Sequence, residues 1–284
     1  MVIPENFRKC VVFLFAPTNP GHAHQPVGTA FIVGIPAAAP RQGDASPLRE
    51  NEGWYIHYLV TARHMVGLAR RYGTLFARFH LLDGTTTFLE FPRDSWHEHP
   101  ATDVAAALFR PPDSMDQANI SIAVFELDEV AKQHKVSVGD EVFFMGLFSE
   151  HPGTEHNQPI SRFGNIALMP GEKVTVDVGD STARIRAYLV EARSWGGHSG
   201  SPAFVAFPPD RFLNSITVNE GVPIFLLGLV QGHYDIEREM KFQGDIGKVS
   251  SNAGIAVVVP AQDIYDLLVS EDVIGAERGR GLRK

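Results

Sequence analysis

The residues with the clearest chemical potential surround Ser199, in the run Trp-Gly-Gly-His-Ser-Gly-Ser-Pro over 195–202. Gly197 and Gly200 have no Cβ, so the backbone can turn tightly and push the Ser199 hydroxyl outward. The same turn can aim the N–H groups of Gly197 and Ser199 at one point. A hydroxyl beside two convergent donors suits acyl transfer, because it supplies a nucleophile and a site for the oxyanion. The alternative is a Gly/Ser surface turn without chemistry.

A serine is a weak nucleophile at neutral pH and needs a base, and the base needs an orienting group. His64 ends the apolar run that begins at Tyr58, and Asp103 opens the apolar run over 104–108. Each has a structural explanation when taken alone, since such a histidine can be a core residue and an aspartate often forms a turn. Together, in the order His, Asp, Ser, they predict a catalytic triad.

These segments resemble the chymotrypsin-fold serine proteases, nearest their HtrA-like and bacterial glutamyl-endopeptidase branches. The segments that carry the likeness are 28–33, 61–64, 103–105, 197–202 and 252–256. The resemblance implies that Ser199 attacks a peptide carbonyl, His64 moves the proton and Asp103 orients the imidazole. The N–H groups of Gly197 and Ser199 would bind the oxyanion, and no metal or organic cofactor would be needed.

The expected function is therefore that of a serine endopeptidase, a hydrolase that acts on a peptide or protein substrate through an acyl-enzyme. The alternative is a catalytically weak or inactive protease-fold module that binds a peptide in its cleft. The sequence departs from the pattern of this family at two positions beside the expected catalytic residues. His198 precedes Ser199 where animal digestive enzymes carry an aspartate, and Arg63 before His64 is unusual in either branch.

The resemblance also implies a pocket for the residue before the cut, walled by 193–196, 230–233 and 253–254. Its candidate substrate-binding residues are Arg193, Gln231, Gly232, His233 and Gly254. A guanidinium on the pocket floor would select Glu or Asp. The competing interpretation places Arg193 in solvent and leaves a small apolar pocket lined by Val230 and Ala253. Strand register decides between the two, since a slip of one residue reverses the face.

Many short apolar runs separated by turn signals predict an all-β architecture around these residues. Asp83-Gly84 is a strong hairpin signal, and 36–53 is expected to be an inserted loop. The resemblance implies two six-stranded antiparallel β-barrels of the chymotrypsin type and a short C-terminal helix. We expect a single domain over 1–284, with an N-terminal barrel at about 9–125, a C-terminal barrel at about 136–260, a closing helix at 261–270 and a basic tail at 271–284.

Composition and charge narrow the remaining function classes. The formal net charge of −8 argues against a nucleic-acid partner, which would favour a basic face. No apolar stretch approaches the roughly 20 residues of a membrane-spanning helix, and no signal peptide is evident, so we expect a cytoplasmic protein with no membrane partner.

Cys10 is the single cysteine, which excludes an internal disulfide. The pairs His22/His24 and His97/His99 are too few ligands for a closed metal site, so we expect no metal. The oligomeric state is left open.

Overall fold

The computed structural model describes residues 3–17, 24–36, 55–178, 181–193, 196–208, 211, 223–242 and 245–279. Most of the expected 36–53 insertion lies outside the described residues. So do His22 and Trp195, and with Trp195 part of one expected pocket wall.

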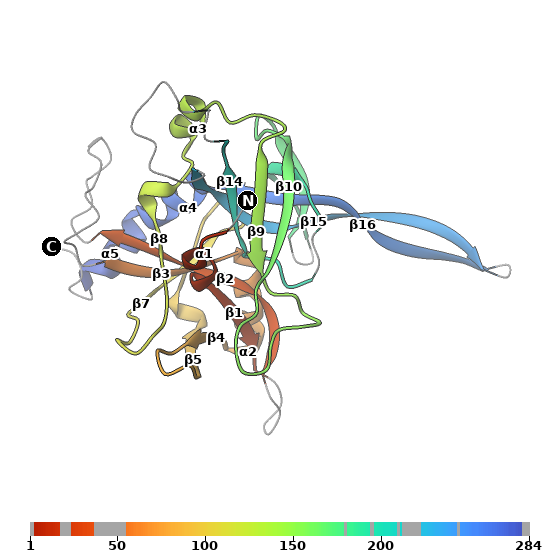
Figure 1. Ribbon diagram of the computed structural model, residues 1–284. Helices are drawn as coiled ribbons and strands as arrows, with labels where there is room; N and C mark the ends of the chain where they lie inside the picture. Colours follow the sequence, from red (N-terminus) through yellow and green to blue (C-terminus); the bar gives the residue numbers. More distant parts are fainter. Residues whose placement is uncertain are drawn as a thin grey trace.

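The N-terminal half forms one curled sheet in which the strands run in the order β5-β4-β1-β2-β3-β7-β6, with β8 parallel to β2 (Figure 1). Asp83-Gly84 turns the β4–β5 hairpin as predicted, with Gly84 at φ 81° and the Leu81 N–H bonded to the Thr85 carbonyl. The strands are β1 (Val11–Ala16), β2 (Gln25–Pro36), β3 (Tyr55–Thr61), β4 (Thr74–His80), β5 (Thr86–Pro92), β6 (Trp96–Glu98), β7 (Ala105–Phe109) and β8 (Ile120–Ser121).

The C-terminal half forms a closed antiparallel barrel, in the order β10-β13-β16-β15-β14-β9, with a separate β11–β12 hairpin beside it. The expected all-β, chymotrypsin-like fold class is confirmed. The difference is that only this second sheet closes, whereas the first is a curled, open path within the described residues. The strands are β9 (Glu141–Gly146), β10 (Ile160–Leu168), β11 (Lys173–Val178), β12 (Ser181–Arg186), β13 (Tyr188–Glu191), β14 (Pro202–Ala206), β15 (Ile224–Phe242) and β16 (Asp245–Pro260).

Strands β15 and β16 are much longer than the apolar runs in them predict. They stay paired from Gly228↔Pro260 out to Phe242↔Asp245. Their outer halves project from the barrel as a two-stranded arm (Figure 1). The sequence of this outer part is polar and charged, so its hydrophobic pattern gave no strand signal.

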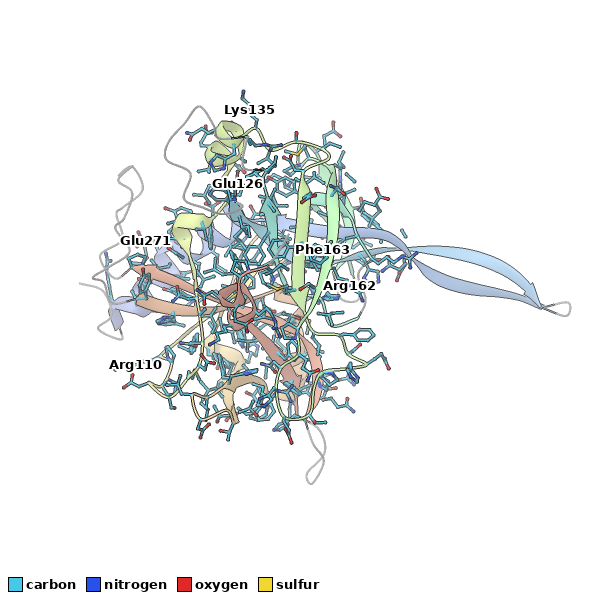
Figure 2. The ribbon with its side chains drawn as sticks, in the orientation of Figure 1. Arg110, Glu126, Lys135, Arg162, Phe163 and Glu271 are labelled. Carbon is cyan, nitrogen blue, oxygen red and sulfur yellow. The ribbon has the colours of Figure 1, made fainter. Side chains whose placement is uncertain are left out.

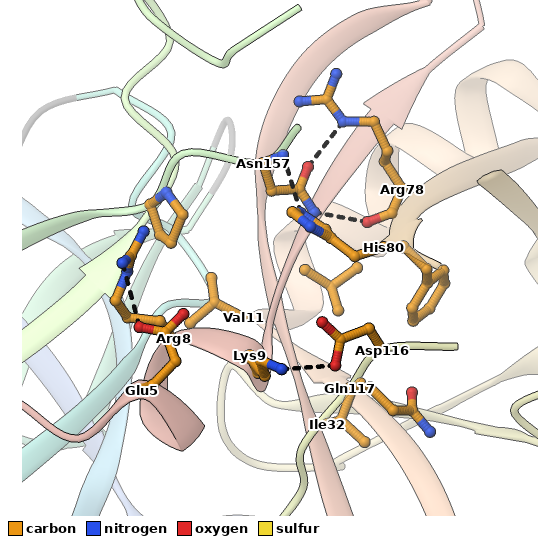
Figure 3. Close-up of a pocket in the computed structure, with 13 residues that line it drawn as sticks. Glu5, Arg8, Lys9, Val11, Ile32, Arg78, His80, Asp116, Gln117 and Asn157 are labelled. Atoms are coloured by element: carbon orange, nitrogen blue, oxygen red, sulfur yellow. Dashed lines mark hydrogen bonds and ion pairs between the residues drawn. The ribbon is translucent and has the colours of Figure 1, made fainter. Parts of the chain in front are cut away.

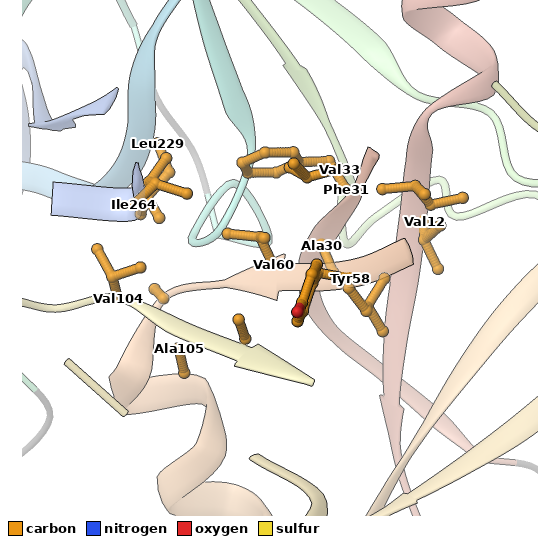
Figure 4. Close-up of a cluster of buried hydrophobic side chains, with 14 of the residues drawn as sticks. Val12, Ala30, Phe31, Val33, Tyr58, Val60, Val104, Ala105, Leu229 and Ile264 are labelled. Atoms are coloured by element: carbon orange, nitrogen blue, oxygen red, sulfur yellow. The ribbon is translucent and has the colours of Figure 1, made fainter. Parts of the chain in front are cut away.

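The core is built from the apolar strand residues and extends across both sheets. Val12, Phe31, Tyr58 and Val60 of the N-terminal sheet lie in the same buried cluster as Leu229 of the C-terminal barrel (Figure 4). Cys10 is fully buried in it, and burial raises the pKa of its thiol far above the usual range. A buried thiol of this kind is inert.

Helices are short and lie at the edges of the sheets. The segment expected to be a basic tail contains a second helix over 271–279, in which Val273 and Glu277 are fully buried. No helix in the described parts of the chain is both long and apolar enough to cross a membrane. The helices are α1 (Glu5–Lys9), α2 (Arg63–Tyr72), α3 (Asp128–His134), α4 (Ala261–Leu268) and α5 (Glu271–Gly279), with 3₁₀ turns η1 (Arg93–Ser95) and η2 (Ile122–Val124).

A buried acid lies where the chain crosses between the two sheets, just before α3. Glu126, labelled in Figure 2, is 1% exposed, and its carboxylate oxygens lie 2.9 and 3.0 Å from His134 Nδ1. Burial, together with the nearby Asp140 charge, raises the pKa of Glu126 to about 8. This carboxyl therefore titrates near neutral pH, away from the candidate catalytic residues.

Candidate active site

His64 and Asp103 are brought together by the pairing of two neighbouring strands. Strand β3 ends at Thr61, which lies opposite Ala105 at the start of β7. Helix α2 begins directly after β3 and carries His64 in its first turn. The Asp103 carboxylate accepts the His64 backbone N–H at Oδ1 (2.8 Å) and faces the ring Nδ1 at Oδ2 (2.6 Å). The carboxylate is fully buried, so this contact fixes both the position and the orientation of the imidazole.

Arg63, the unusual neighbour of His64, forms hydrogen bonds to the loop that carries Asp103. Its backbone N–H donates to the Asp103 carbonyl (3.2 Å), and its guanidinium Nη1 donates to the His99 carbonyl (3.0 Å). The His99 ring in turn accepts the backbone N–H groups of Ala101 and Thr102 at Nδ1. Arg63 and His99 therefore order the loop that presents Asp103. The Arg63 side chain thus has a structural role that the sequence alone did not reveal.

Ser199 lies in a turn that only glycine accommodates at two positions. Gly197 has φ 101° and Gly200 has φ 84°, the region that L side chains rarely adopt. A Cβ on Gly200 would also lie 2.0 Å from the Thr29 carbonyl oxygen and 2.3 Å from Thr61 Oγ1. The glycine pattern read from the sequence is thus explained by backbone conformation and by close contact with the N-terminal sheet.

The turn over residues 196–201 carries Ser199, the predicted nucleophile, and is called the nucleophile turn from here on. It is hydrogen-bonded to both halves of the molecule. The Thr29 N–H on β2 donates to the Ser199 carbonyl (3.0 Å), and the Gly200 N–H donates to the Val230 carbonyl on β15 (2.8 Å). The Thr61 hydroxyl donates to the Thr29 carbonyl (2.7 Å), which connects the turn to the strand that leads to His64. An added methyl group at Gly28 would meet both the Met65 side chain and the Ser199 carbonyl. The three predicted catalytic residues therefore converge on the junction between the two sheets.

Three successive carbonyls of the turn are held by hydrogen bonds. Gly196 O accepts from Ser149 Oγ (3.1 Å), Gly197 O from Thr29 Oγ1 (2.7 Å) and His198 O from the Ser201 N–H (2.9 Å). In a trans peptide the C=O and the following N–H point in opposite directions. The directions of the Gly197 and Ser199 N–H groups, the expected oxyanion donors, are fixed in this way.

No hydrogen bond joins the His64 ring to the Ser199 hydroxyl, although both side chains belong to the described residues. Nucleophile and base are often loosely aligned in the absence of substrate, and they tighten when a substrate binds. Of the two hydrogen bonds expected in a triad, the structure therefore has the one between Asp103 and His64 and lacks the one between His64 and Ser199. It is the contact on which an active enzyme and a peptide-binding module would differ.

His198 is buried behind the nucleophile as an uncharged ring. It is 1% exposed, it packs edge-on against Phe144 at 5.3 Å, and neither ring nitrogen has a partner among the described residues. Burial lowers the pKa of His198 to about 4, helped by the nearby charges of Arg162 and His233. A neutral imidazole therefore packs directly before Ser199.

The predicted specificity residues come together where β13, β16 and β15 run side by side. The Ala192 N–H bonds to the Gly254 carbonyl (2.9 Å), and the next residue, Arg193, is exposed. Gly232 has open space where a Cβ would lie, and His233 Nε2 is 3.3 Å from Asp235 Oδ1. These segments therefore lie on neighbouring strands, and the pocket that they would wall stays a prediction.

Gln231 differs from its neighbours in this group because its amide is already engaged. The side chain is buried, and Nε2 donates to the Asp177 carbonyl of β11 at 2.6 Å. The amide therefore ties the β11–β12 hairpin to the barrel in this structure. The acidic and the apolar specificities both remain predictions.

The described residues hold no cluster of three or more metal-ligating side chains. The pocket drawn in Figure 3 lies between α1, β1, β4 and the segment before β10, and is lined by residues such as Lys9, His80 and Asp116. None of the predicted catalytic residues lines it, so it is separate from the candidate active site.

Sequence reasoning missed the hydroxyls that hold the nucleophile turn. Thr29 Oγ1 donates to Gly197 O and accepts the Leu147 N–H (2.9 Å), and it is fully buried, as is Thr61. A threonine in an apolar strand is typical of β structure and carries no functional signal by itself. Only the contact across 168 residues of chain reveals what Thr29 does.

Comparisons with known proteins add the following findings. No family model matches the sequence, and no curated protein matches it. Among solved structures, the chain is similar to the crystal structure of Deg5, with a TM-score of 0.45 and 12% identity over 80% of this chain and 81% of that one. It is also similar to the serine endoprotease from Yersinia pestis, with a TM-score of 0.42 and 12% identity over 99% of this chain and 68% of that one. The chemistry proposed below comes from the side chains of this chain.

Proposed function

We propose that this chain is a serine endopeptidase that hydrolyses peptide bonds through Ser199, His64 and Asp103. The observation that carries the proposal is the double contact of the buried Asp103 carboxylate with the His64 backbone N–H and ring Nδ1. A buried carboxylate that accepts a hydrogen bond from Nδ1–H fixes the tautomer of the imidazole and leaves Nε2 as the proton acceptor. His64 lies in the first turn of α2, directly after the end of β3. At that strand end the Thr61 hydroxyl bonds to the Thr29 carbonyl, and the Thr29 N–H bonds to the Ser199 carbonyl.

The chemistry follows from these positions. Ser199 Oγ attacks the peptide carbonyl while His64 Nε2 takes its proton, and Asp103 stabilises the imidazolium. The Gly197 and Ser199 N–H groups bind the oxyanion of the tetrahedral intermediate. His64 then gives the proton to the leaving amine as the C–N bond breaks, and an acyl-enzyme remains. Water then gives a proton to His64 Nε2 and attacks the ester carbonyl; the bond to Ser199 Oγ breaks, His64 returns the proton to that oxygen, and the carboxylic acid product leaves.

A fluorophosphonate probe tests this proposal, because it reacts covalently with an activated serine. The full chain should be labelled, and Ser199→Ala should abolish both labelling and peptide hydrolysis. Ser201→Ala is the matched control, since its hydroxyl is buried two residues away and has no partner among the described residues. Labelling of Ser199→Ala at the rate of the unsubstituted chain would contradict the assignment.

The same experiment decides the alternative function. The missing bond between His64 and Ser199 is the observation that favours a peptide-binding module without turnover. In that case the unsubstituted chain would resist the probe and yet bind peptides. Ser199→Ala would then leave peptide affinity unchanged.

A further inference from the structure

The segment that follows β9 connects the candidate active site to strand β4 of the N-terminal sheet. It covers 147–159 and returns to the barrel as β10. At its start, the Leu147 N–H bonds to Thr29 Oγ1, and Ser149 Oγ donates to the Gly196 carbonyl. Its later part, from Pro152 to Asn157, folds around a single side chain, Arg78 of β4.

Arg78 is a buried cation that is satisfied by backbone oxygens. It is 5% exposed, and its guanidinium donates to the carbonyls of Pro152, Gly153, Thr154 and His156 at 2.8–3.3 Å. Arg78 Nε donates to Asn157 Oδ1 (2.8 Å), and Asn157 Nδ2 donates back to the Arg78 carbonyl (2.7 Å), as drawn in Figure 3.

Among the described residues, no carboxylate forms an ion pair with Arg78. The guanidinium also lies over the Phe15 ring, with Cζ 4.9 Å from its centroid. Taking an unpaired cation out of water is expensive unless its donors are satisfied. The bent path of the segment supplies the acceptors, so the position of the segment and the burial of Arg78 depend on each other.

The other end of the segment contacts the peptide unit that carries one of the two expected oxyanion donors. Ser149 holds the Gly196 carbonyl, and the same peptide unit carries the Gly197 N–H on its opposite side. A displaced Ser149 would free this unit to rotate, and the donor would no longer point at the oxyanion. Preorganised donors are effective because they need no reorientation during reaction.

We propose that Arg78 is a positioning residue for the oxyanion site and acts through the 147–159 segment and the Ser149 hydroxyl. Its effect on rate rests on the proposed function, whereas its effect on the conformation of the nucleophile turn does not. The test therefore has one readout that needs no activity and one that does.

Hydrogen exchange of the full chain provides the first readout. The Gly200 and Ser201 N–H groups are bonded to the Val230 and His198 carbonyls and report on the turn. Arg78→Met should raise exchange both in 150–158 and at these two amides. Arg93→Met, which removes an exposed arginine that forms an ion pair with Asp94, should change neither. Faster exchange in 150–158 with an unchanged turn would overturn the proposal.

Kinetics provide the second readout, through a double-mutant cycle. Complete loss of an oxyanion donor costs about 10²–10³ in kcat, so Arg78→Met and Ser149→Ala should each cost about tenfold or more with little change in KM. If Arg78 acts through Ser149, the double variant should lose no more than the worse single variant. Losses that multiply would show independent action and refute the proposal. A chain that proves inactive would refute the protease function and leave the exchange experiment decisive.

Gly153→Ala covers the case in which Arg78→Met does not fold. Gly153 has φ 72°, and an added Cβ would lie 2.1 Å from the His156 carbonyl, so the substitution disturbs the segment and leaves the sheets untouched. It should reproduce both effects of Arg78→Met. Normal exchange at Gly200 and Ser201 in a displaced segment would count against the proposed coupling.

Discussion

Replacing Asp103 with asparagine tests the orienting acid most directly, and the structure fixes how the new amide must lie. Oδ1 accepts the His64 backbone N–H at 2.8 Å, so the amide oxygen must take this place. The amide nitrogen then faces the ring Nδ1, which lies 2.6 Å from the second carboxylate oxygen. The flipped amide would instead set two N–H donors against each other in a fully buried site.

The forced orientation gives the magnitude. An amide N–H facing Nδ1 makes that nitrogen an acceptor, so the ring proton moves to Nε2. The protonated Nε2 can then no longer accept the proton of Ser199. The corresponding change in a chymotrypsin-type triad lowers kcat by about 10⁴, which is about 5 kcal/mol of activation free energy. We expect a loss of this order near neutral pH and a folded protein, because size and hydrogen-bonding sites are kept.

The assay combines peptide turnover with ¹⁵N NMR of the His64 ring. The ring proton should be on Nδ1 in the unsubstituted chain and on Nε2 in Asp103→Asn. Asp94→Asn serves as control, since the Asp94 side chain is 92% exposed and lies apart from the triad. A loss of less than about tenfold, against the 10⁴ expected, with the proton still on Nδ1, would refute the role given to Asp103.

Three further predictions address stability and specificity. Burial raises the pKa of Glu126 from its usual value of 4.5 to about 8, so its protonated form stabilises the fold fully below pH 4.5 and this contribution is lost as the pH rises through 8. In urea unfolding, the free energy of unfolding should therefore fall more steeply between pH 5 and 9 in the unsubstituted chain than in Glu126→Gln; equal slopes would show that Glu126 is ionised throughout. Thr29→Val keeps the shape of the side chain but leaves a buried N–H and a carbonyl unpaired, so it should cost about 1–3 kcal/mol in the same measurement and lower kcat; a neutral result would remove Thr29 from the support of the turn. A positional peptide library should show either Glu or Asp before the cut, lost in Arg193→Ala, or Val, Ala or Leu, unchanged in that variant; efficient cleavage after Lys or Arg would exclude both pockets.

Features that depend only on neighbouring residues can be predicted from the sequence. The glycines at 197 and 200 predict a sharp turn because backbone conformation is a local property, and both have positive φ. The Asp83-Gly84 hairpin and the apolar strands follow from the same kind of short-range preference. The order of His64, Asp103 and Ser199 indicated a triad through the resemblance, and the β3–β7 pairing brings the first two together.

The polar groups that support the site depend on contacts between distant parts of the chain. Thr29 meets Gly197 across 168 residues, and Arg78 meets its segment across 74 to 79 residues, contacts that no local pattern encodes. The burial of α5 and the length of β15 and β16 likewise depend on pairing and packing with distant parts of the chain. A side chain's partners are set by strand register and by how the two sheets meet, since a shift of one residue turns a side chain to the opposite face. The sequence therefore predicts which groups would do chemistry, whereas the packing of the two sheets determines which polar groups surround them.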